Sequence, residues 1–315
     1  MKALRDNWLI QIEITNSCFL ECDNCTRFIG HHKKPYFMKL EMIEQAIDSL
    51  EGFKGGIGIM GGEPLMHPDF IDICKLIQKK VPREKRYIWT SGYKWKHYRS
   101  IVRKTFEERV YYNDHQGNEQ KHQPVLMAIE DYLKDRPFMK ELIDKCWIQE
   151  KWSPSINPKG GFFCEVAAAM DILFEGPGGY PLEKGWWDKS PQQFQDQVER
   201  YCYRCSAALP MPPVFIKKGM DYVSCSNYKR LKDLKTPKFV KNRVECVERE
   251  YTKAQINDYA KDWQPWLYLG DEPRKSFYAM YGLFAGFLVA FGKKVRKRRN
   301  KIKECLHPSQ KQSRP

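Results

Sequence analysis

Three cysteines near the N-terminus have a spacing that suits iron-sulfur chemistry. Cys18, Cys22 and Cys25 follow an apolar stretch in the pattern Cys-x3-Cys-x2-Cys. A cubane cluster needs four ligands, which are usually thiolates, so three cysteines leave one iron open. An open metal position is a place where a cofactor or a substrate binds. The spacing predicts a reactive cluster, and the alternatives are a structural zinc site or a chance trio among the 11 cysteines.

Two further motifs come directly after predicted strands. Gly61-Gly62-Glu63-Pro64 follows the apolar run at residues 56–60, and Thr90-Ser91-Gly92 follows residues 87–89. Together with the three cysteines, these motifs resemble the radical S-adenosylmethionine superfamily. Its members pair a three-cysteine cluster loop with a glycine-glycine-glutamate-proline motif after the second strand.

This resemblance implies a cofactor and a reaction. S-adenosylmethionine carries an amino group and a carboxylate that can chelate the open iron. Glycines allow close backbone approach, and a carboxylate such as that of Glu63 pairs with an ammonium group. With an electron from a donor such as flavodoxin or ferredoxin, the family splits the sulfonium and releases a 5'-deoxyadenosyl radical, which abstracts hydrogen from substrate. The resemblance implies a catalytic [4Fe-4S] cluster on the three cysteines, and S-adenosylmethionine bound by Gly61, Gly62, Glu63, Pro64, Thr90 and Ser91.

One position departs from the family pattern. The family usually has an aromatic residue just before the third cysteine, where it packs near the adenine, and this chain has Asn24 there. Phe19 and Phe28 are the nearest alternative rings, and each is also an ordinary loop or core residue. The sequence does not choose between them.

The apolar pattern of the first half alternates between strands and helices. It predicts strands at residues 8–15, 56–60, 86–90 and 108–112, and helices at residues 40–50, 69–80, 124–134 and 137–145. Alternation of this kind indicates an α/β fold with a parallel sheet. The family resemblance implies a partial (β/α) TIM-like barrel with its active site at the carboxyl ends of the strands. His115, just after the fourth predicted strand, is our candidate proton acceptor.

Four more cysteines form a second group in the order Cys-x17-Cys-x37-Cys-x2-Cys. They are Cys146, Cys164, Cys202 and Cys205. The residues between the first two predict a hairpin with arms at 147–152 and 161–163, and a helix at 165–173. Four thiolates complete either a second cubane or a structural zinc site. The arrangement resembles the twitch domain, a shorter relative of the SPASM domain, and this implies a small α+β domain with one auxiliary [4Fe-4S] cluster.

The resemblance extends in particular to the radical dehydrogenases that oxidise an aminocyclitol alcohol, 2-deoxy-scyllo-inosamine. After hydrogen abstraction from a carbon that bears oxygen, the substrate radical must lose one electron and a proton, and a nearby cluster can take the electron. We therefore expect a radical oxidoreductase acting on a sugar or cyclitol alcohol. The alternatives are a radical peptide maturase and, from another class, a non-catalytic zinc or iron-sulfur protein that acts at a nucleic acid or a membrane.

Three cysteines have no partner by spacing. They are Cys225, Cys246 and Cys305. Cys225 is either a core residue or an exchange ligand of the second cluster.

Charge and hydropathy limit the classes of binding partner and the cellular location that the sequence supports. The net charge is +15, but nine of these charges lie after residue 290, so no basic stripe for nucleic acid runs along the rest of the chain. The N-terminus lacks the long apolar core of a secretory signal. We therefore expect a cytoplasmic enzyme and no nucleic-acid partner.

The C-terminal part combines an apolar segment with a basic one. Residues 277–291 carry no charge, and a polybasic run follows at 293–303. Fifteen helical residues extend about 22 Å, which is short of a bilayer core of roughly 30 Å. The segment is either a buried helix or a peripheral contact with the inner face of the membrane. The predicted division is a barrel at 1–145, an auxiliary domain at 146–245 and an extension at 246–315.

Overall fold

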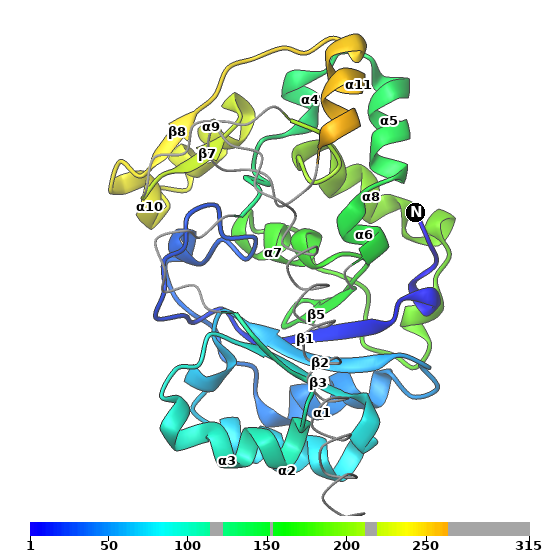
Figure 1. Ribbon diagram of the computed structural model, residues 1–315, viewed down its shortest axis with the longest axis vertical. Coiled ribbons are helices and arrows are strands. Elements are labelled where there is room, and N and C mark those ends of the chain that lie inside the picture. Colours follow the sequence, from blue (N-terminus) through cyan, green and yellow to red (C-terminus); the bar gives the residue numbers. More distant parts are fainter. Residues whose placement is uncertain (114–121, 152–153, 212–218, 264–315) are drawn as a thin grey trace, which may run out of the picture. The chain divides into compact units, whose positions relative to one another are not determined.

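A six-stranded, mostly parallel sheet organises the protein (Figure 1). The computed structural model describes residues 1–113, 122–151, 154–211 and 219–263. The described residues all belong to one compact unit, Met1–Leu269, and the predicted apolar segment 277–291 and polybasic run 293–303 lie outside the described part. The strand order is β4-β3-β2-β1-β5-β6. The strands are β1 Leu9–Thr15, β2 Gly56–Gly61, β3 Arg86–Thr90, β4 Val110–Tyr112, β5 Ser155–Asn157 and β6 Gly160–Phe162.

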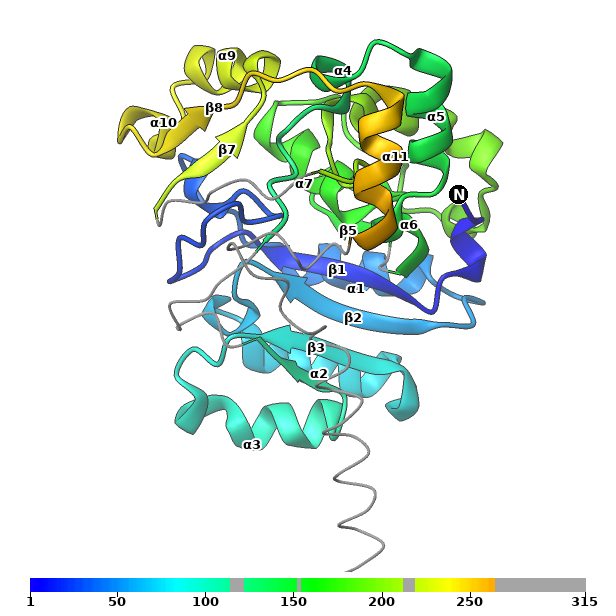
Figure 2. The ribbon, with the colours of Figure 1, turned by 45° about the horizontal axis from the view of Figure 1, so that its top comes forward.

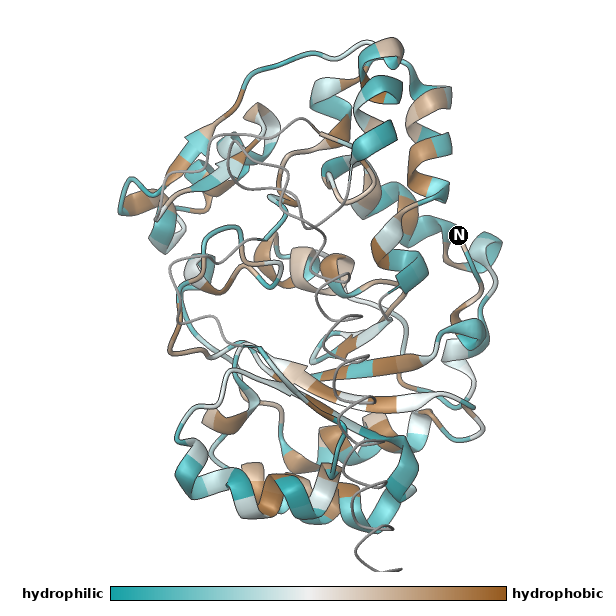
Figure 3. Ribbon diagram, in the orientation of Figure 1, coloured by the Kyte–Doolittle hydropathy of each residue, from teal (hydrophilic) through white to brown (hydrophobic). Residues whose placement is uncertain are grey.

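The central strand β1 separates two chemically different faces. It pairs in parallel with β2 on one side and with β5 on the other. Because side chains alternate along a strand, Ile10, Ile12 and Ile14 share one face, and Gln11 and Glu13 share the other. All five are buried. Figure 3 shows hydrophobic residues along these central strands and on the helices around them.

Three helices cover the aliphatic face of the sheet. Figures 1 and 2 show them on one side of the strands. Their apolar stripes enter the core cluster that also contains the β1 isoleucines. The helices are α1 Leu40–Ser49, α2 Phe70–Lys80 and α3 Trp95–Phe106. The opposite, polar face of β1 is contacted by the helix α7, Glu165–Leu173, through Gln11. This parallel βα arrangement confirms the predicted α/β class.

A short hairpin extends the sheet beyond β1. β5 and β6 are antiparallel, with Ser155 opposite Phe162 and Asn157 opposite Gly160. The predicted first arm at 147–152 was wrong, because Trp147–Lys151 form the helix α6. The hairpin therefore begins several residues later than the aromatic run indicated. The predicted helix at 165–173 is confirmed as α7.

A second, two-stranded parallel sheet lies late in the described chain. β7, Asp221–Val223, pairs with β8, Val244–Cys246. We call residues 219–246, which contain this pair, the β7–β8 module. The remaining helices are α4 Ile129–Tyr132, α5 Arg136–Asp144, α8 Gln195–Tyr201, α9 Cys225–Asp233, α10 Pro237–Val240 and α11 Lys253–Asp262.

Other boundaries differ modestly from those predicted. The helix expected at 124–134 is a single turn, α4, and the helix expected at 137–145 is α5, shifted by one residue. Within the described residues, no helix is both long and apolar enough to cross a bilayer. Since Met1–Leu269 are one unit, the division at residue 145 stays a prediction.

Candidate active site

The three cysteines of the first motif lie on the loop that follows β1. All three side chains are partly exposed. Burial, and then the neighbouring Cys25 and Cys18 thiolates, raise the pKa of Cys22 to about 12. Burial, and then Cys25 and Glu63, raise the pKa of Cys18 to about 12 against an opposing hydrogen bond from Leu20. Thiolates that repel one another lie close together, and a cluster bound to them would remove this repulsion.

The glycine motif presses against the start of this loop. The Gly62 amide donates to the Thr15 carbonyl and the Glu63 amide to the Ser17 carbonyl, both at 2.8 Å. A Cβ at Gly61 would collide with the Thr15 carbonyl oxygen, and one at Gly62 with that of Ser17. Only glycine permits this backbone approach, so the two motifs form one surface at the carboxyl ends of β1 and β2.

Glu63 joins the glycine motif to the end of β3. Its side chain is fully buried. One carboxylate oxygen accepts from the Leu65 amide at 3.0 Å and the Thr90 hydroxyl at 2.6 Å. The other accepts from the Ser91 amide at 2.7 Å and the Ser91 hydroxyl at 2.6 Å. The predicted residues Glu63, Thr90 and Ser91 are therefore brought together. These four hydrogen bonds occupy the acceptor positions of the carboxylate. Binding of an ammonium group by Glu63 therefore stays a prediction.

The position that lacks the family's aromatic residue has a structural explanation. Asn24 has a φ of 51°, a left-handed conformation that asparagine tolerates better than aromatic residues do. Its side-chain oxygen accepts from the Tyr222 amide at 2.9 Å. Phe28 is buried in the core, whereas Phe19 is 39% exposed and packs on Tyr93 with 5.4 Å between ring centroids. Of the two rings, Phe19 is the one accessible to a ligand.

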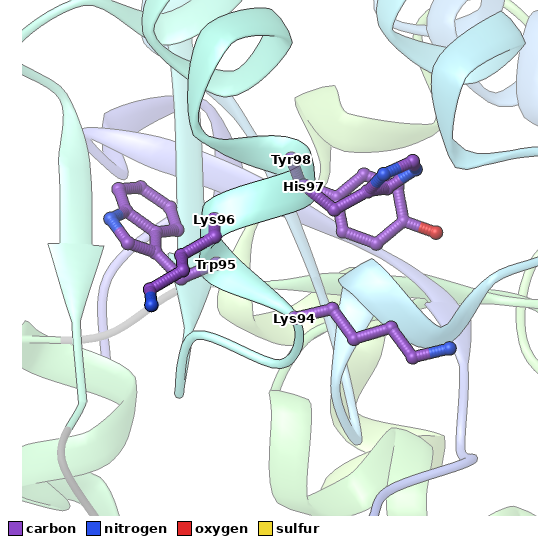
Figure 4. Close-up of a pocket in the computed structure, with 5 residues that line it drawn as sticks. All are labelled: Lys94, Trp95, Lys96, His97 and Tyr98. Carbon is purple, nitrogen blue, oxygen red and sulfur yellow. The ribbon is translucent and has the colours of Figure 1, made fainter.

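An open depression of about 500 Å³ lies at the start of α3 (Figure 4). Lys94, Trp95, Lys96, His97 and Tyr98 line it, and none of the cluster cysteines does. Tyr93, the residue before Lys94, packs on Phe19 of the cysteine loop.

The comparison with family models agrees with this geometry. Residues 12–116 match the model described as the Radical SAM superfamily. This part of the chain is a radical SAM domain. Such a domain implies one [4Fe-4S] cluster and S-adenosylmethionine, and the three thiols and the glycine turn form a donor set that fits them.

Comparisons with individual proteins add the following findings. A crystal structure of BtrN in an open conformation aligns with a TM-score of 0.39 and 14% identity, covering 63% of this chain and 87% of that chain. A crystal structure of BtrN in complex with AdoMet and 2-DOIA aligns with a TM-score of 0.38 and 14% identity, covering 62% and 87%. No curated protein sequence matches the chain.

A buried polar network that was not predicted from the sequence lies on the polar face of β1. Arg27 pairs with Glu13 at 3.1 Å and with Glu165 of α7 at 2.9 Å, and all three side chains are almost fully buried. Gln11 joins the same network, donating to Glu165 at 3.0 Å and accepting from Arg27 at 3.0 Å. Ser155 donates to Glu13 at 2.7 Å. The alternation of Gln11 and Glu13 with isoleucines was the signal for it.

The charges in this network are strongly coupled. Burial raises the pKa of Glu13 above its usual range, although Arg27 opposes that shift. Burial disfavours the charged form of Arg27, but the two carboxylates outweigh it and hold its pKa above the ordinary value. The network ties the loop after the cluster cysteines to β1 and to α7.

The four cysteines of the second group are close enough to influence one another's pKa values. Burial, and then Cys146, Cys164 and Cys205, raise the pKa of Cys202. Burial and Cys146 raise that of Cys205 to about 12. The Ala207 amide lies 3.3 Å from the Cys205 sulfur, and such hydrogen bonds to sulfur tune cluster potentials.

Neither cysteine group is arranged to hold a single metal ion. Among the residues with described positions, no three His, Cys, Asp or Glu side chains are grouped so that they could hold a metal ion. A tetrahedral zinc with Zn–S bonds of about 2.3 Å needs its thiolates about 3.8 Å apart. A four-iron cluster lies between its ligands and holds them farther apart.

Cys225 and Cys246 are neighbours, which their spacing did not reveal. Their sulfurs are 2.8 Å apart, and Glu248 lies 3.3 Å from the Cys225 sulfur. Hydrogen bonding to Cys246, and then burial, raise the pKa of Cys225 to about 12. Cys225 thus has a thiol partner within its own module. His115 and Cys305 lie outside the described residues.

Proposed function

We propose that this protein is a radical S-adenosylmethionine oxidoreductase that removes hydrogen from a carbon bearing a hydroxyl group, in a sugar or cyclitol alcohol. When bound, the cluster on Cys18, Cys22 and Cys25 with S-adenosylmethionine supplies a carbon radical strong enough to take that hydrogen atom. The observation that carries the proposal is the joint surface at the ends of β1, β2 and β3. There the cysteine loop, the glycine turn and Glu63 are in direct backbone contact.

The residues of this surface position ligands. The Gly61-Gly62 turn brings backbone groups within reach of a cofactor next to Cys18. The hydrogen bonds from Thr90 and Ser91 to Glu63 fix the turn against β3. A rigid turn keeps its carbonyl groups oriented, which lowers the entropic cost of binding an ammonium group.

Oxidation of an alcohol needs an acceptor for a second electron. We assign this role to the second cysteine group, Cys146, Cys164, Cys202 and Cys205, because its members raise one another's pKa values and lie in the same compact unit. A [4Fe-4S] cluster on them would complete its coordination without an open iron. Loss of the proton from the substrate hydroxyl group completes the change from alcohol to carbonyl.

Two other functions predict different products. A peptide maturase would transfer hydrogen from a peptide to the cofactor and leave sugars unchanged. A non-catalytic zinc or iron-sulfur protein would cleave no S-adenosylmethionine at all. We also expect an electron donor of the flavodoxin or ferredoxin type and a cytoplasmic location, with peripheral contact at the inner membrane face as the further option.

The experiment uses the reconstituted full chain under anaerobic conditions. Aminocyclitols and sugars with deuterium on the carbinol carbons are added with S-adenosylmethionine and dithionite. We expect deuterium in 5'-deoxyadenosine and a carbonyl product from at least one alcohol. Cys202→Ser should keep deuterium transfer but lose the carbonyl product, whereas Cys74→Ala, which removes a buried cysteine of α2 outside both groups, should keep both. Deuterium transfer from peptides alone would replace the proposal by the maturase function.

A further inference from the structure

Four consecutive residues of the cluster loop are held by the β7–β8 module, about 200 positions later in the chain. The Gly219 amide donates to the Asp23 carboxylate at 2.6 Å. The Asn24 amide donates to the Asp221 carboxylate at 2.6 Å. Lys238 donates to the Cys22 carbonyl at 3.0 Å. Exposed Glu21 completes the series, with Arg243 at 2.8 Å and Lys241 at 3.4 Å.

Lys238 is the centre of these contacts. Its side chain is 1% exposed, and a lysine is almost never so buried unless it is paired. Its ammonium group lies 2.7 Å from the Asp221 carboxylate. The aliphatic stem fills the space beside Gly30, where any Cβ would collide with it. The site is therefore built around this one side chain.

Asp221 is equally committed. One oxygen accepts from the Asn24 amide and from Lys238, and the other lies 2.8 Å from the ring nitrogen Nε2 of His31. The other ring nitrogen of His31 lies 3.0 Å from the Thr236 hydroxyl. Asp221 thus connects two points of the cluster loop to the module.

We propose that Asp221 and Lys238 are positioning residues of the cluster site: they fix the backbone at the cluster cysteine Cys22 and at Asn24, which directly precedes the third cluster cysteine, and the Lys238 ammonium stabilises the reduced cluster. The first part follows from the contacts alone. The second rests on the proposed function, since it needs a cluster on Cys22 and Cys25.

The sign of the electrostatic effect follows from charge. Reduction adds one negative charge to the cluster, and a buried cation next to a ligand residue favours that state. If Lys238 is replaced by a neutral residue, Asp221 keeps the donors Asn24 and His31 and hence its ionised form. The surroundings of the cluster become more negative, and reduction becomes harder.

Three substitutions separate anchoring from charge. Lys238→Met removes the charge and the donor, whereas Lys238→Gln removes the charge but keeps a donor near the Cys22 carbonyl. Lys241→Met is the matched control, since Lys241 belongs to the same module and is half-exposed, and Glu21 keeps its closer partner Arg243 in this variant. Amide hydrogen exchange of residues 18–25 in the cluster-free full chain measures anchoring. The midpoint potential of the cluster reconstituted on Cys18, Cys22 and Cys25 measures the charge effect.

We expect exchange in Lys238→Met to be about tenfold faster at these residues and unchanged in α1 and α2. Lys238→Gln should exchange at nearly the wild-type rate. Both variants should have a reduced fraction about tenfold lower at fixed potential, which is about 59 mV for a one-electron couple. Lys241→Met should change neither quantity. If Lys238→Met fails to fold, the potential of Lys238→Gln decides the charge effect.

The inference and the proposed function fail in different ways. If both Lys238 variants have the exchange rate and the midpoint potential of wild type, the inference is overturned, even though the wild-type chain binds its cluster. The same shifts in Lys241→Met would also overturn it, because they would show a general effect of surface charge. A wild-type chain that binds no cluster would contradict the proposed function and the electrostatic part together, and hydrogen exchange alone would then decide the anchoring.

Discussion

Replacement of Glu63 by glutamine tests the central contact between the glycine motif and β3. The carboxylate accepts two backbone amides, those of Leu65 and Ser91, one on each oxygen. A glutamine side chain has a single acceptor oxygen, and its NH2 group must face one of these two amides. The hydroxyl groups of Thr90 and Ser91 can rotate to accept, but a backbone amide cannot. Neither orientation of the new side chain satisfies both amides.

The cost follows from the lost hydrogen bond. A bond to a charged group contributes about 1.5–3 kcal/mol, and a buried donor without a partner costs about 1–3 kcal/mol. Since these terms overlap, we expect Glu63→Gln to lower the free energy of unfolding by about 2–4 kcal/mol. The assay is urea unfolding of the cluster-free chain, followed by circular dichroism, with the midpoint and slope compared with wild type.

A surface substitution of the same type provides the control. Glu44 is 42% exposed and pairs with Lys80 at 2.7 Å, so Glu44→Gln should cost less than about 1 kcal/mol. If Glu63→Gln unfolded within about 0.5 kcal/mol of wild type, the four-donor arrangement around its carboxylate would be refuted.

Three further predictions concern other parts of the structure. Arg27→Met leaves two buried carboxylates unpaired, so it should lower the unfolding free energy by about 3–5 kcal/mol, measured by the same urea assay; a loss below about 1 kcal/mol would contradict the ion pairs. Burial lowers the pKa of His67, whose Nε2 lies 2.9 Å from the Met38 carbonyl oxygen. As the pH falls, the unfolded chain therefore binds this proton before the folded chain does, and the free energy of unfolding decreases below the unfolded-state pKa of about 6.5. The variant His67→Gln should lose less unfolding free energy than wild type between pH 7.5 and 5.5. Glutathione disulfide should oxidise Cys225 and Cys246 to a disulfide by two exchange steps that release two glutathione thiols; the chain would lose two hydrogens in mass, and free thiols at both positions after treatment would exclude the pairing.

The parts of the fold that were predictable are those with a local period. The β1 alternation and the apolar stripe of α2 determine their elements. The motifs after β1 and β2 met because parallel strands end at one edge of a sheet. The meeting of Glu63 with Thr90 and Ser91 followed from the same rule.

The parts that were missed depend on tertiary contacts. The aromatic residues at 147–152 favour a strand by composition, but the structure has the helix α6 there. Asp221 and Lys238 contact a loop about 200 residues away in the sequence, and no local spacing connects them to it. Asn24 is a different case. Its departure from the family pattern was visible in the sequence, and its hydrogen bond with the Tyr222 amide explains the departure.

The most direct test of the account is cleavage of S-adenosylmethionine by the reconstituted full chain. After anaerobic reconstitution with iron and sulfide, bound iron and 5'-deoxyadenosine formed with dithionite are measured for wild type and for the variant Cys18→Ala, Cys22→Ala, Cys25→Ala. The account predicts roughly eight irons in wild type and roughly four in the variant, with 5'-deoxyadenosine only from wild type. Bound zinc in place of iron, with no cleavage by wild type, would contradict it.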